Sequence, residues 1–410
     1  MRKAGKTSFL LLLALVFFAV GCGGRQSMSV TPNVPPNSGE QIPPGQTPSI
    51  VSTIFVENSD GTGDGVARLV RSMQSRGLYL HQTPASPNGL IAPTDVVILK
   101  INAQWDERGG TNTDLIRGVI QAILDHPGGF RGEIIVADNG QAQFGSAPGG
   151  GGSLDWARNN AVDQTQSTLR VIRYFHAAGH RVTGVLWDTF TRIRVQEFNT
   201  GDMRDGFVVE DEVRSTGIAI SYPKFTTEFG THVSFREGIW DPSTRTYNSD
   251  ILKVINMPVL KSHRGFQVTA AVKNYMGVPS DWLTRGRGRA HNSVGTGGMG
   301  TLMVETRMPV LNILDMIWVA PQGGPRSQFS TAVQVNKIAA STDPVALDHW
   351  ASINVLMPVA PATIRASMNP NGTTPGTFGH WLRLSMNELV RAGIPTTMNE
   401  AEMLVVIGGS

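Results

Sequence analysis

The sequence predicts an α/β protein in which a mostly parallel sheet is flanked by helices, with a hairpin-rich insertion in the middle. Short, near-continuous runs of aliphatic and β-branched residues suit strands that are buried on both faces. These runs alternate with stretches whose apolar residues recur at helical spacing. An order of strand, helix, strand, helix, strand favours a parallel sheet with helices on its faces.

The first half of the chain contains most of this alternation. Asn112 or Thr113 can cap the second helix, because a short polar side chain there accepts hydrogen bonds from free backbone N–H groups. In order, the predicted elements are the strand STIFVEN (52–58), the helix DGVARLVRSMQS (64–75), the strand DVVILKIN (95–102), the helix TNTDLIRGVIQAILDH (111–126), the strand GEIIVAD (132–138), the helix STLRVIRYFHAAGH (167–180) and the strand RVTGVLWD (181–188).

Residues 190–250 have a different character. They are rich in threonine, arginine and aromatic residues and alternate in polarity, as in FVVEDEVRSTGIAISYP, which indicates hairpins or an insertion. Regular order then returns, and Thr342 or Asp343 can cap the last helix, with Pro344 in its first turn. The later elements are the strands ILKVINMPVL (251–260), LNILDMIWV (311–319) and VQVNKIAAS (333–341), followed by a helix that begins TDPVALDHWASINVL.

The amino terminus predicts export and lipid anchoring. Three basic residues precede an apolar run, Phe9 to Val20, that is too short to remain as a membrane-spanning helix. The ending Ala19-Val20-Gly21-Cys22 resembles the lipobox of bacterial lipoproteins, in which the cysteine is acylated. We therefore expect a signal peptide at 1–21, a lipid on Cys22, a Pro/Gly/Ser-rich tether at 22–50 and a folded domain at 51–410. The expected location is the cell envelope, and Gly23 favours the outer membrane in a Gram-negative cell.

Charge and cysteine content exclude several function classes. Removal of residues 1–21 leaves 32 basic and 32 acidic residues, so the exported chain has no basic excess for nucleic acid. Cys22 is the single cysteine, which excludes an internal disulfide and a cysteine-ligated iron–sulfur cluster on this chain. The sequence also lacks the G-x-S-x-G motif of many serine hydrolases and the H-E-x-x-H motif of zinc proteases.

A concentration of positive charge follows the strand at 251–260. Between Lys253 and His291 there are seven lysines and arginines and one acid, Asp281. Ligands of α/β sheets bind at the carboxyl ends of strands, so this cluster predicts an anionic partner. We expect a helix to begin near Gln267 or Val268 and to add the positive potential of its free N–H groups.

Two further interpretations concern this region. Thr269 and Lys273 would share a face of that helix, although Lys273 and Asn274 could equally belong to a helix end before Gly277. The glycine-rich segment 286–300 is expected to have no fixed structure. It would be either a mobile lid that carries Arg287, Arg289 and His291 over a ligand, or a solvated loop.

Together these motifs resemble the family known as domain of unknown function 362. The resemblance is carried by VVILKIN, TNTDLIRGVI, IIVAD with PGGG after it, VINMPVLKSHRGFQVTAAVKNYMG, ILDMI with QGGP after it, and STDPVALD, and runs from about residue 50 to the C-terminus. It implies an α/β fold whose motif residues gather at one site. Many relatives carry a ferredoxin-like domain with cysteine-ligated clusters, from which this chain departs, so a redox role would need a partner or an organic cofactor.

Three hypotheses for function remain open. In an enzyme, His263 would be the general acid or base beside Lys261 and Lys273. In a binding protein, the same cations would hold an envelope component such as a lipid headgroup or a cell-wall acid. The third hypothesis is a divalent metal held by His263, His291 and aspartates. The nearby cations make such a site electrostatically costly, so no residue is assigned as a metal ligand. The residues expected to bind the substrate are Lys100, Asn102, Thr269, Asn274, Arg289, His291, Asp343 and Asp348.

Overall fold

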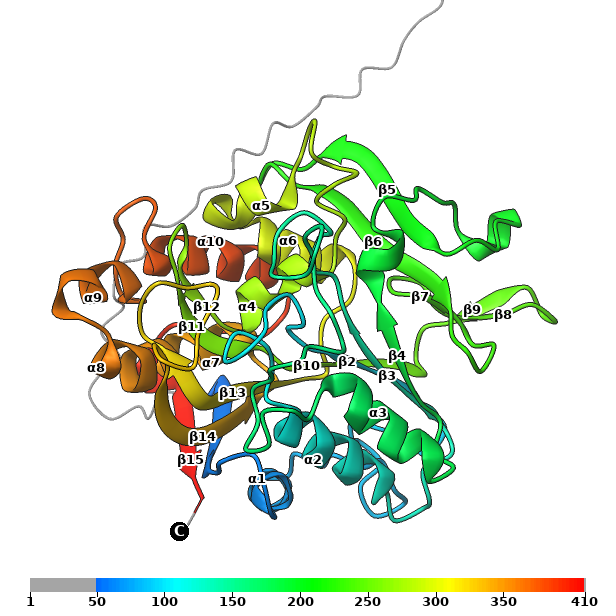
Figure 1. The fold of residues 1–410 in the computed structure, drawn as a ribbon, viewed down its shortest axis with the longest axis horizontal. Coiled ribbons are helices and arrows are strands. Elements are labelled where there is room, and N and C mark those ends of the chain that lie inside the picture. Colours follow the sequence, from blue (N-terminus) through cyan, green and yellow to red (C-terminus); the bar gives the residue numbers. More distant parts are fainter. Residues whose placement is uncertain (1–48, 409–410) are drawn as a thin grey trace, which may run out of the picture. The chain divides into compact units, whose positions relative to one another are not determined.

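A ten-stranded mixed sheet runs through the protein, whose computed structural model describes residues 49–408 (Figure 1). The predicted signal peptide, Cys22 and all but the last two residues of the predicted tether lie outside the described residues. The main path of the sheet has the order β15-β1-β14-β13-β10-β2-β3-β4. Its strands are β1 (Ser52–Asn58), β2 (Val96–Lys100), β3 (Glu133–Asp138), β4 (Val182–Leu186), β10 (Leu252–Asn256), β13 (Leu311–Ala320), β14 (Val333–Ser341) and β15 (Met403–Ile407).

Most neighbouring strands on this path are parallel. The pairs β4–β3, β3–β2, β2–β10 and β10–β13 are parallel, and so is β1–β15. Only β14 is reversed, since it pairs antiparallel with both β13 and β1. The predicted α/β class with a mostly parallel sheet is therefore confirmed.

Helices cover one face of the sheet, as the periodicity predicted. They are α1 (Gly65–Gln74), α2 (Thr113–Leu124) and α3 (Thr168–Ala177) (Figure 1). Side chains alternate along β2, so Val97 and Leu99 pack toward these helices while Val96 and Ile98 enter the core on the other face. Asn112 caps α2 by accepting hydrogen bonds from the backbone N–H groups of Asp114 and Leu115.

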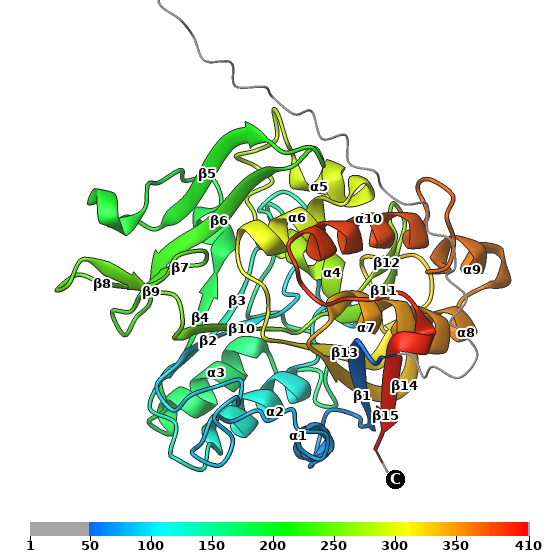
Figure 2. The ribbon, with the colours of Figure 1, turned by 180° about the vertical axis from the view of Figure 1, so that it is seen from behind.

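The other face carries a second sheet and the remaining helices (Figure 2). The second sheet is antiparallel, has the strand order β5-β6-β7-β8-β9 and lies within the predicted insertion at 190–250, which confirms the hairpin-rich character of that segment. These strands are β5 (Gly206–Val213), β6 (Ala219–Thr226), β7 (His232–Ser234), β8 (Gly238–Asp241) and β9 (Thr246–Asn248). The helices are α4 (Ala271–Asn274), α5 (Ala290–Ser293), α6 (Gly298–Glu305), α7 (Pro344–Ala351), α8 (Met357–Val359), α9 (Ala362–Met368) and α10 (Phe378–Arg391).

The segment 251–269 differs from its prediction in two ways. The run expected as one strand is broken at Pro258 into β10 and β11 (Val259–His263), because proline has no N–H for the ladder. The helix expected near Gln267 is instead strand β12 (Gln267–Thr269), which pairs antiparallel with β11. The backbone N–H groups that a helix would leave free at this position are therefore not available to a ligand.

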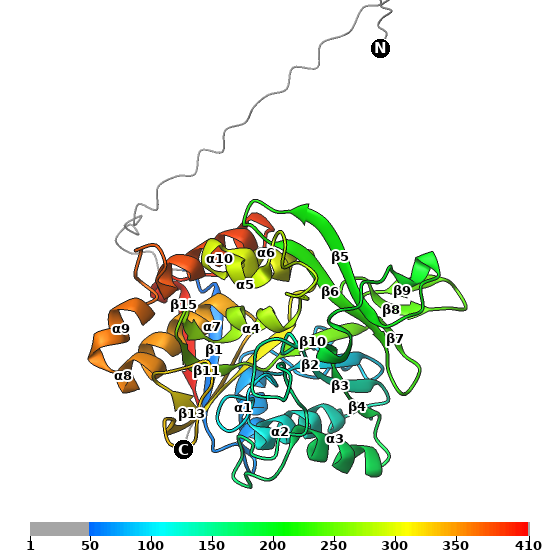
Figure 3. The ribbon, with the colours of Figure 1, turned by 45° about the horizontal axis from the view of Figure 1, so that its top comes forward.

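The glycine-rich segment 286–300 also differs from its prediction, because from residue 290 onward it is helical. Figure 3 shows α5 and α6 beside α10. A side chain at Gly300 would collide with the backbone of Ser385 in α10, and one at Gly297 would press on Leu384. The glycines therefore allow two helices to approach closely, and the expectation of a segment without fixed structure was wrong for residues 290–300. Within residues 49–408, no helix is both long and apolar enough to cross a bilayer.

Candidate functional site

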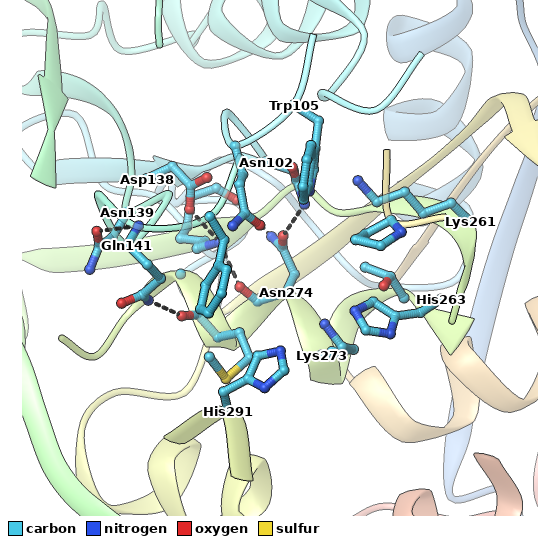
Figure 4. Close-up of a pocket in the computed structure, with 17 residues that line it drawn as sticks. Asn102, Trp105, Asp138, Asn139, Gln141, Lys261, His263, Lys273, Asn274 and His291 are labelled. Carbon is cyan, nitrogen blue, oxygen red and sulfur yellow. Dashed lines mark hydrogen bonds and ion pairs between the residues drawn. The ribbon is translucent and has the colours of Figure 1, made fainter. Parts of the chain in front are cut away.

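A cavity of about 240 Å³ lies at the carboxyl ends of β2 and β3, beside the β11–β12 hairpin (Figure 4). This is the edge at which α/β sheets bind their ligands. Eight of the predicted site residues line it: Lys100, Asn102, Lys261, His263, Thr269, Lys273, Asn274 and His291. The other lining residues are Gln104, Trp105, Asp138, Asn139, Gln141, Phe144, Met276, Gly277 and Pro325.

The register of the β11–β12 hairpin explains the lysine-x-histidine spacing. Lys261 is paired with Thr269, and His263 with Gln267. Residues two apart on a strand, and residues paired across two strands, share a face of the sheet. Lys261, His263 and Thr269 therefore face the cavity together, while Val268 is fully buried in the core on the opposite face.

Lys100 is a buried cation whose bonding capacity is filled. Its Nζ lies 2.8 Å from Asp138 Oδ1 and donates to the carbonyl oxygens of Ile101, at 3.0 Å, and Asn274, at 2.6 Å. Three acceptors match the three N–H donors of an ammonium group. A side chain at Gly277 would collide with both Asp138 and Lys100, so glycine at this position is required by the ion pair.

The other two lysines are less well satisfied. Lys261 Nζ donates to the carbonyl oxygen of Gly109 at 2.5 Å, whereas within residues 49–408 no hydrogen bond or ion pair reaches the Lys273 ammonium. Burial, followed by repulsion from Lys273, lowers the pKa of Lys261 to about 7. Burial, followed by repulsion from Lys100, lowers the pKa of Lys273 to about 7 as well. Both groups therefore lose or gain a proton near neutral pH.

His263 is held as a neutral ring. Its Nδ1 accepts hydrogen bonds from the backbone N–H groups of Gly265 and Phe266, both at 3.0 Å. Burial and the charge of Lys273 lower the pKa of His263 far below its ordinary value. A neutral imidazole that accepts at Nδ1 carries its proton at Nε2, so His263 can offer an N–H to a ligand but cannot accept a proton in this tautomer.

A chain of buried amides fixes the floor of the cavity. Asn274 Nδ2 donates to Asn256 Oδ1 at 2.8 Å, and Asn256 Nδ2 donates to Asn312 Oδ1 at 2.9 Å. Asn102 Nδ2 lies 3.4 Å from Asn274 Oδ1. These contacts tie α4 to the ends of β2, β10 and β13. Two buried oxygens along the cavity, Asn102 Oδ1 and Thr269 Oγ1, have no hydrogen-bond partner among the described residues, so a ligand can use them.

Aromatic side chains form the outer wall. Trp105 and Phe144 line the cavity, and Phe144 remains 40% exposed, which marks the entrance. The His291 ring lies 5.7 Å from Phe144 and 5.2 Å from Phe266 between ring centroids. A buried carboxylate, Asp281, holds this wall in place by accepting from the backbone N–H of His291 at 2.9 Å.

Three predicted site residues lie away from the cavity. Arg289 pairs with Asp281 at 2.5 Å, and its Cζ lies 5.2 Å from the centroid of the Phe144 ring. Asp343 caps α7 and accepts the backbone N–H of Thr397, which ties the carboxyl-terminal segment to the sheet. Asp348 accepts the backbone N–H groups of Ala271 and Val272 at the start of α4. In the structure the motif around these two aspartates therefore caps two helices, and neither aspartate lines the cavity.

Other cavity residues were not among the predicted ones. Asp138 ends the predicted strand at 132–138 and Asn139 follows it, and this position at the carboxyl end of a strand was a usable signal for both. Trp105 and Phe144 lie in loops whose composition gives no sign of a shared site. Asp281 was noted only as the one acid in a basic segment, and its interaction with the wall depends on tertiary contacts.

The described residues contain no group of three or more histidines, cysteines, aspartates or glutamates arranged to hold a metal ion. The rings of His263 and His291 lie 6.5 Å apart between centroids. The third hypothesis was a metal held by these histidines and by aspartates. Two of those aspartates, Asp343 and Asp348, cap α7 and α4 and do not line the cavity.

Comparison with known families adds one finding. Residues 245–352 match the family described as a domain of unknown function, DUF362. This segment is a DUF362 domain. The match includes both strong motifs, from Lys261 to Gly277 and from Asp343 to Asp348, and it does not extend to the motifs before residue 245. Searches of curated proteins and of solved structures gave no match.

Proposed function

We propose that this DUF362 protein binds a small organic anion in the lysine-lined cavity. One observation carries the proposal: three buried lysines line the cavity, and Asp138 is the only carboxylate among the lining residues. Asp138 is already paired with Lys100. Lys261 and Lys273 therefore lack a counter-charge in the lining, and buried charge of one sign is costly unless a ligand of opposite sign accompanies it.

The remaining lining suits an organic anion with a carboxylate or phosphate group. Besides the lysines, the Nε2–H of His263 and the unpartnered hydroxyl of Thr269 can donate to anionic oxygens. Trp105, Phe144 and Met276 supply apolar contact for the rest of the molecule. The volume of about 240 Å³ favours a small ligand.

The proposal includes export and anchoring through Cys22. Its support is the sequence at the amino terminus, where a short apolar run ends at a lipobox-like cysteine. An anion in the cell envelope is then the natural partner, and the balanced charge of the exported chain disfavours nucleic acid.

If the protein is an enzyme, the lysines are better candidates for its chemistry than His263. The hypothesis of His263 as a general base requires a free nitrogen lone pair, but Nδ1 is occupied by two backbone donors. Its strongly lowered pKa also removes the imidazolium form at neutral pH. We therefore propose that His263 orients the ligand as a hydrogen-bond donor.

Calorimetric titration of the full chain with phosphate and a series of mono- and dicarboxylates tests this proposal. We expect at least one of these anions to bind, and Lys261→Met and Lys273→Met each to weaken binding by tenfold or more. Lys337→Met is the matched control, because Lys337 bonds Asn58 on the surface, away from the cavity. Equal affinity in all three variants, or no binding of any anion to the wild type, would overturn the proposal.

A further inference from the structure

The three cavity lysines differ sharply in how their ammonium groups are held. Lys100 has three acceptors, namely Asp138 and two backbone carbonyls. Lys261 has one, the carbonyl oxygen of Gly109. Lys273 has none among residues 49–408, although the residue is only 7% exposed and lines the cavity. Figure 4 shows Lys273 among the residues that line the cavity.

This arrangement favours the neutral amine at Lys273. A buried ammonium without an acceptor is costly, and the fixed positive charge of Lys100 nearby adds repulsion. The Phe266 ring, whose centroid is 5.5 Å from Nζ, offers only a weak contact. A neutral lysine amine that is desolvated beside another cation is a nucleophile toward carbonyl carbon.

We infer that Lys273 forms a covalent imine with a small 2-oxo carboxylate. The inference rests on the proposed anion binding, since the carboxylate of such a compound would be held by Lys261 together with Thr269 and His263. These three residues share the face of the hairpin that looks into the cavity. A carboxylate fixed there leaves the adjacent carbonyl group within the same small cavity as the free amine of Lys273.

The step balances without an oxidant or a reductant. The lone pair of Nζ attacks the carbonyl carbon, a C–N bond forms, and one nitrogen proton moves to the carbonyl oxygen to give a neutral carbinolamine. The Lys261 ammonium, whose pKa lies at about 7, then protonates the hydroxyl group, which leaves as water while the nitrogen lone pair forms the C=N bond. The remaining nitrogen proton returns to the Lys261 amine and leaves the neutral imine.

Lys100 is unsuited to this role. Its ammonium is held by three acceptors, one of which is the Asp138 carboxylate. Burial lowers the pKa of Lys100, but the charge of Asp138 opposes this and favours the protonated form. Gly277 packs directly against the ion pair and leaves no space for a carbonyl compound there. Lys261 keeps its own bond to Gly109 and lies where the carboxylate is expected.

Borohydride trapping of the full chain with pyruvate tests the inference. We expect the intact mass to rise by the mass of pyruvic acid less one oxygen atom, and peptide mapping to place the single modification on Lys273. Lys273→Arg should lose the adduct, because a guanidinium group stays protonated and is not a nucleophile, whereas Lys337→Met should react like the wild type. Mapping in the wild type locates the adduct even if Lys273→Arg does not fold.

Lactate, which has the carboxylate but no carbonyl, separates the two proposals. If lactate binds in calorimetry and pyruvate gives no adduct, imine formation is wrong while anion binding stands. If an adduct forms at Lys273 and lactate does not bind, the covalent step stands and anion recognition fails. Modification spread over several lysines, or retained in Lys273→Arg, would overturn the assignment of Lys273.

Discussion

Lys273 and Lys261 are the residues whose charge depends most on their surroundings. The titratable groups around Lys273 are Lys100 from β2, Asp138 from β3, Lys261 and His263 from β11, and His291 from α5. Only one of these is a carboxylate, and it is paired with Lys100. The protein therefore carries two buried amines whose charged forms are disfavoured when no anion is present.

This predicts that the ligand-free protein gains stability as the pH rises from 7 to 9. A lysine with a folded pKa of about 7 binds fewer protons than its unfolded form, which titrates near 10.5, so the free energy of unfolding rises with pH in that window. Lys273→Met should reduce the gain by up to about 2.7 kcal/mol over two pH units. Urea unfolding at pH 7 and 9 measures this, with Lys337→Met as control. Equal gains in the wild type and Lys273→Met would show that Lys273 has an ordinary pKa.

Residue types and spacings suggested much of the site. Lys261, His263, Thr269 and Lys273 were expected together, and all four line the cavity. The helix face expected to hold Thr269 and Lys273 does not form, because Thr269 belongs to strand β12. The register of the hairpin instead brings Thr269 beside Lys261. Asp343 and Asp348 cap helices and do not line the cavity. A helix-capping aspartate and a ligand-binding aspartate look alike in sequence.

At the scale of elements, the contact between α6 and α10 decides the structure of the segment that carries His291. Glycine normally weakens a helix, by about 1 kcal/mol relative to alanine. Here Gly298 and Gly300 are fully enclosed because they face Ser293 and the backbone of Ser385. The close packing fixes α5 and α6, and through them the cavity wall at His291.

Gly300→Ala is therefore expected to destabilise the protein by about 1–3 kcal/mol, because the added methyl group meets the backbone of α10. Gly295→Ala is the matched control, since no atom lies within 4 Å of the position of its added carbon. Thermal unfolding of both variants measures the difference. The packing argument would be wrong if the two substitutions had equal effects.

At the scale of the whole molecule, both sheets share one core. Trp187, just after β4, is fully buried, and its ring centroid lies 6.2 Å from that of Phe225 and 5.7 Å from that of Phe235. Phe225 belongs to β6 of the second sheet, and Phe235 directly follows β7. The insertion is thus part of the main hydrophobic core rather than a separate unit.

We expect Trp187→Ala to lower the free energy of unfolding of the whole described domain by about 3–5 kcal/mol. Because the core is continuous, both sheets should unfold in one transition, with the same midpoint by tryptophan fluorescence and by far-ultraviolet circular dichroism. Two separate midpoints would show that the insertion folds independently of the main sheet.

The sequence by itself determined the fold class, the strands and helices of the first half, and the lysine and histidine residues of the candidate site. These depend on local properties: the burial of apolar runs, helical periodicity, caps and charge density. The tertiary structure alone decided which polar residues meet. Lys100 bonds the backbone of Asn274, 174 positions away, and Asp348 bonds Ala271, 77 positions away. Such contacts depend on how strands are ordered in the sheet, which no local pattern encodes.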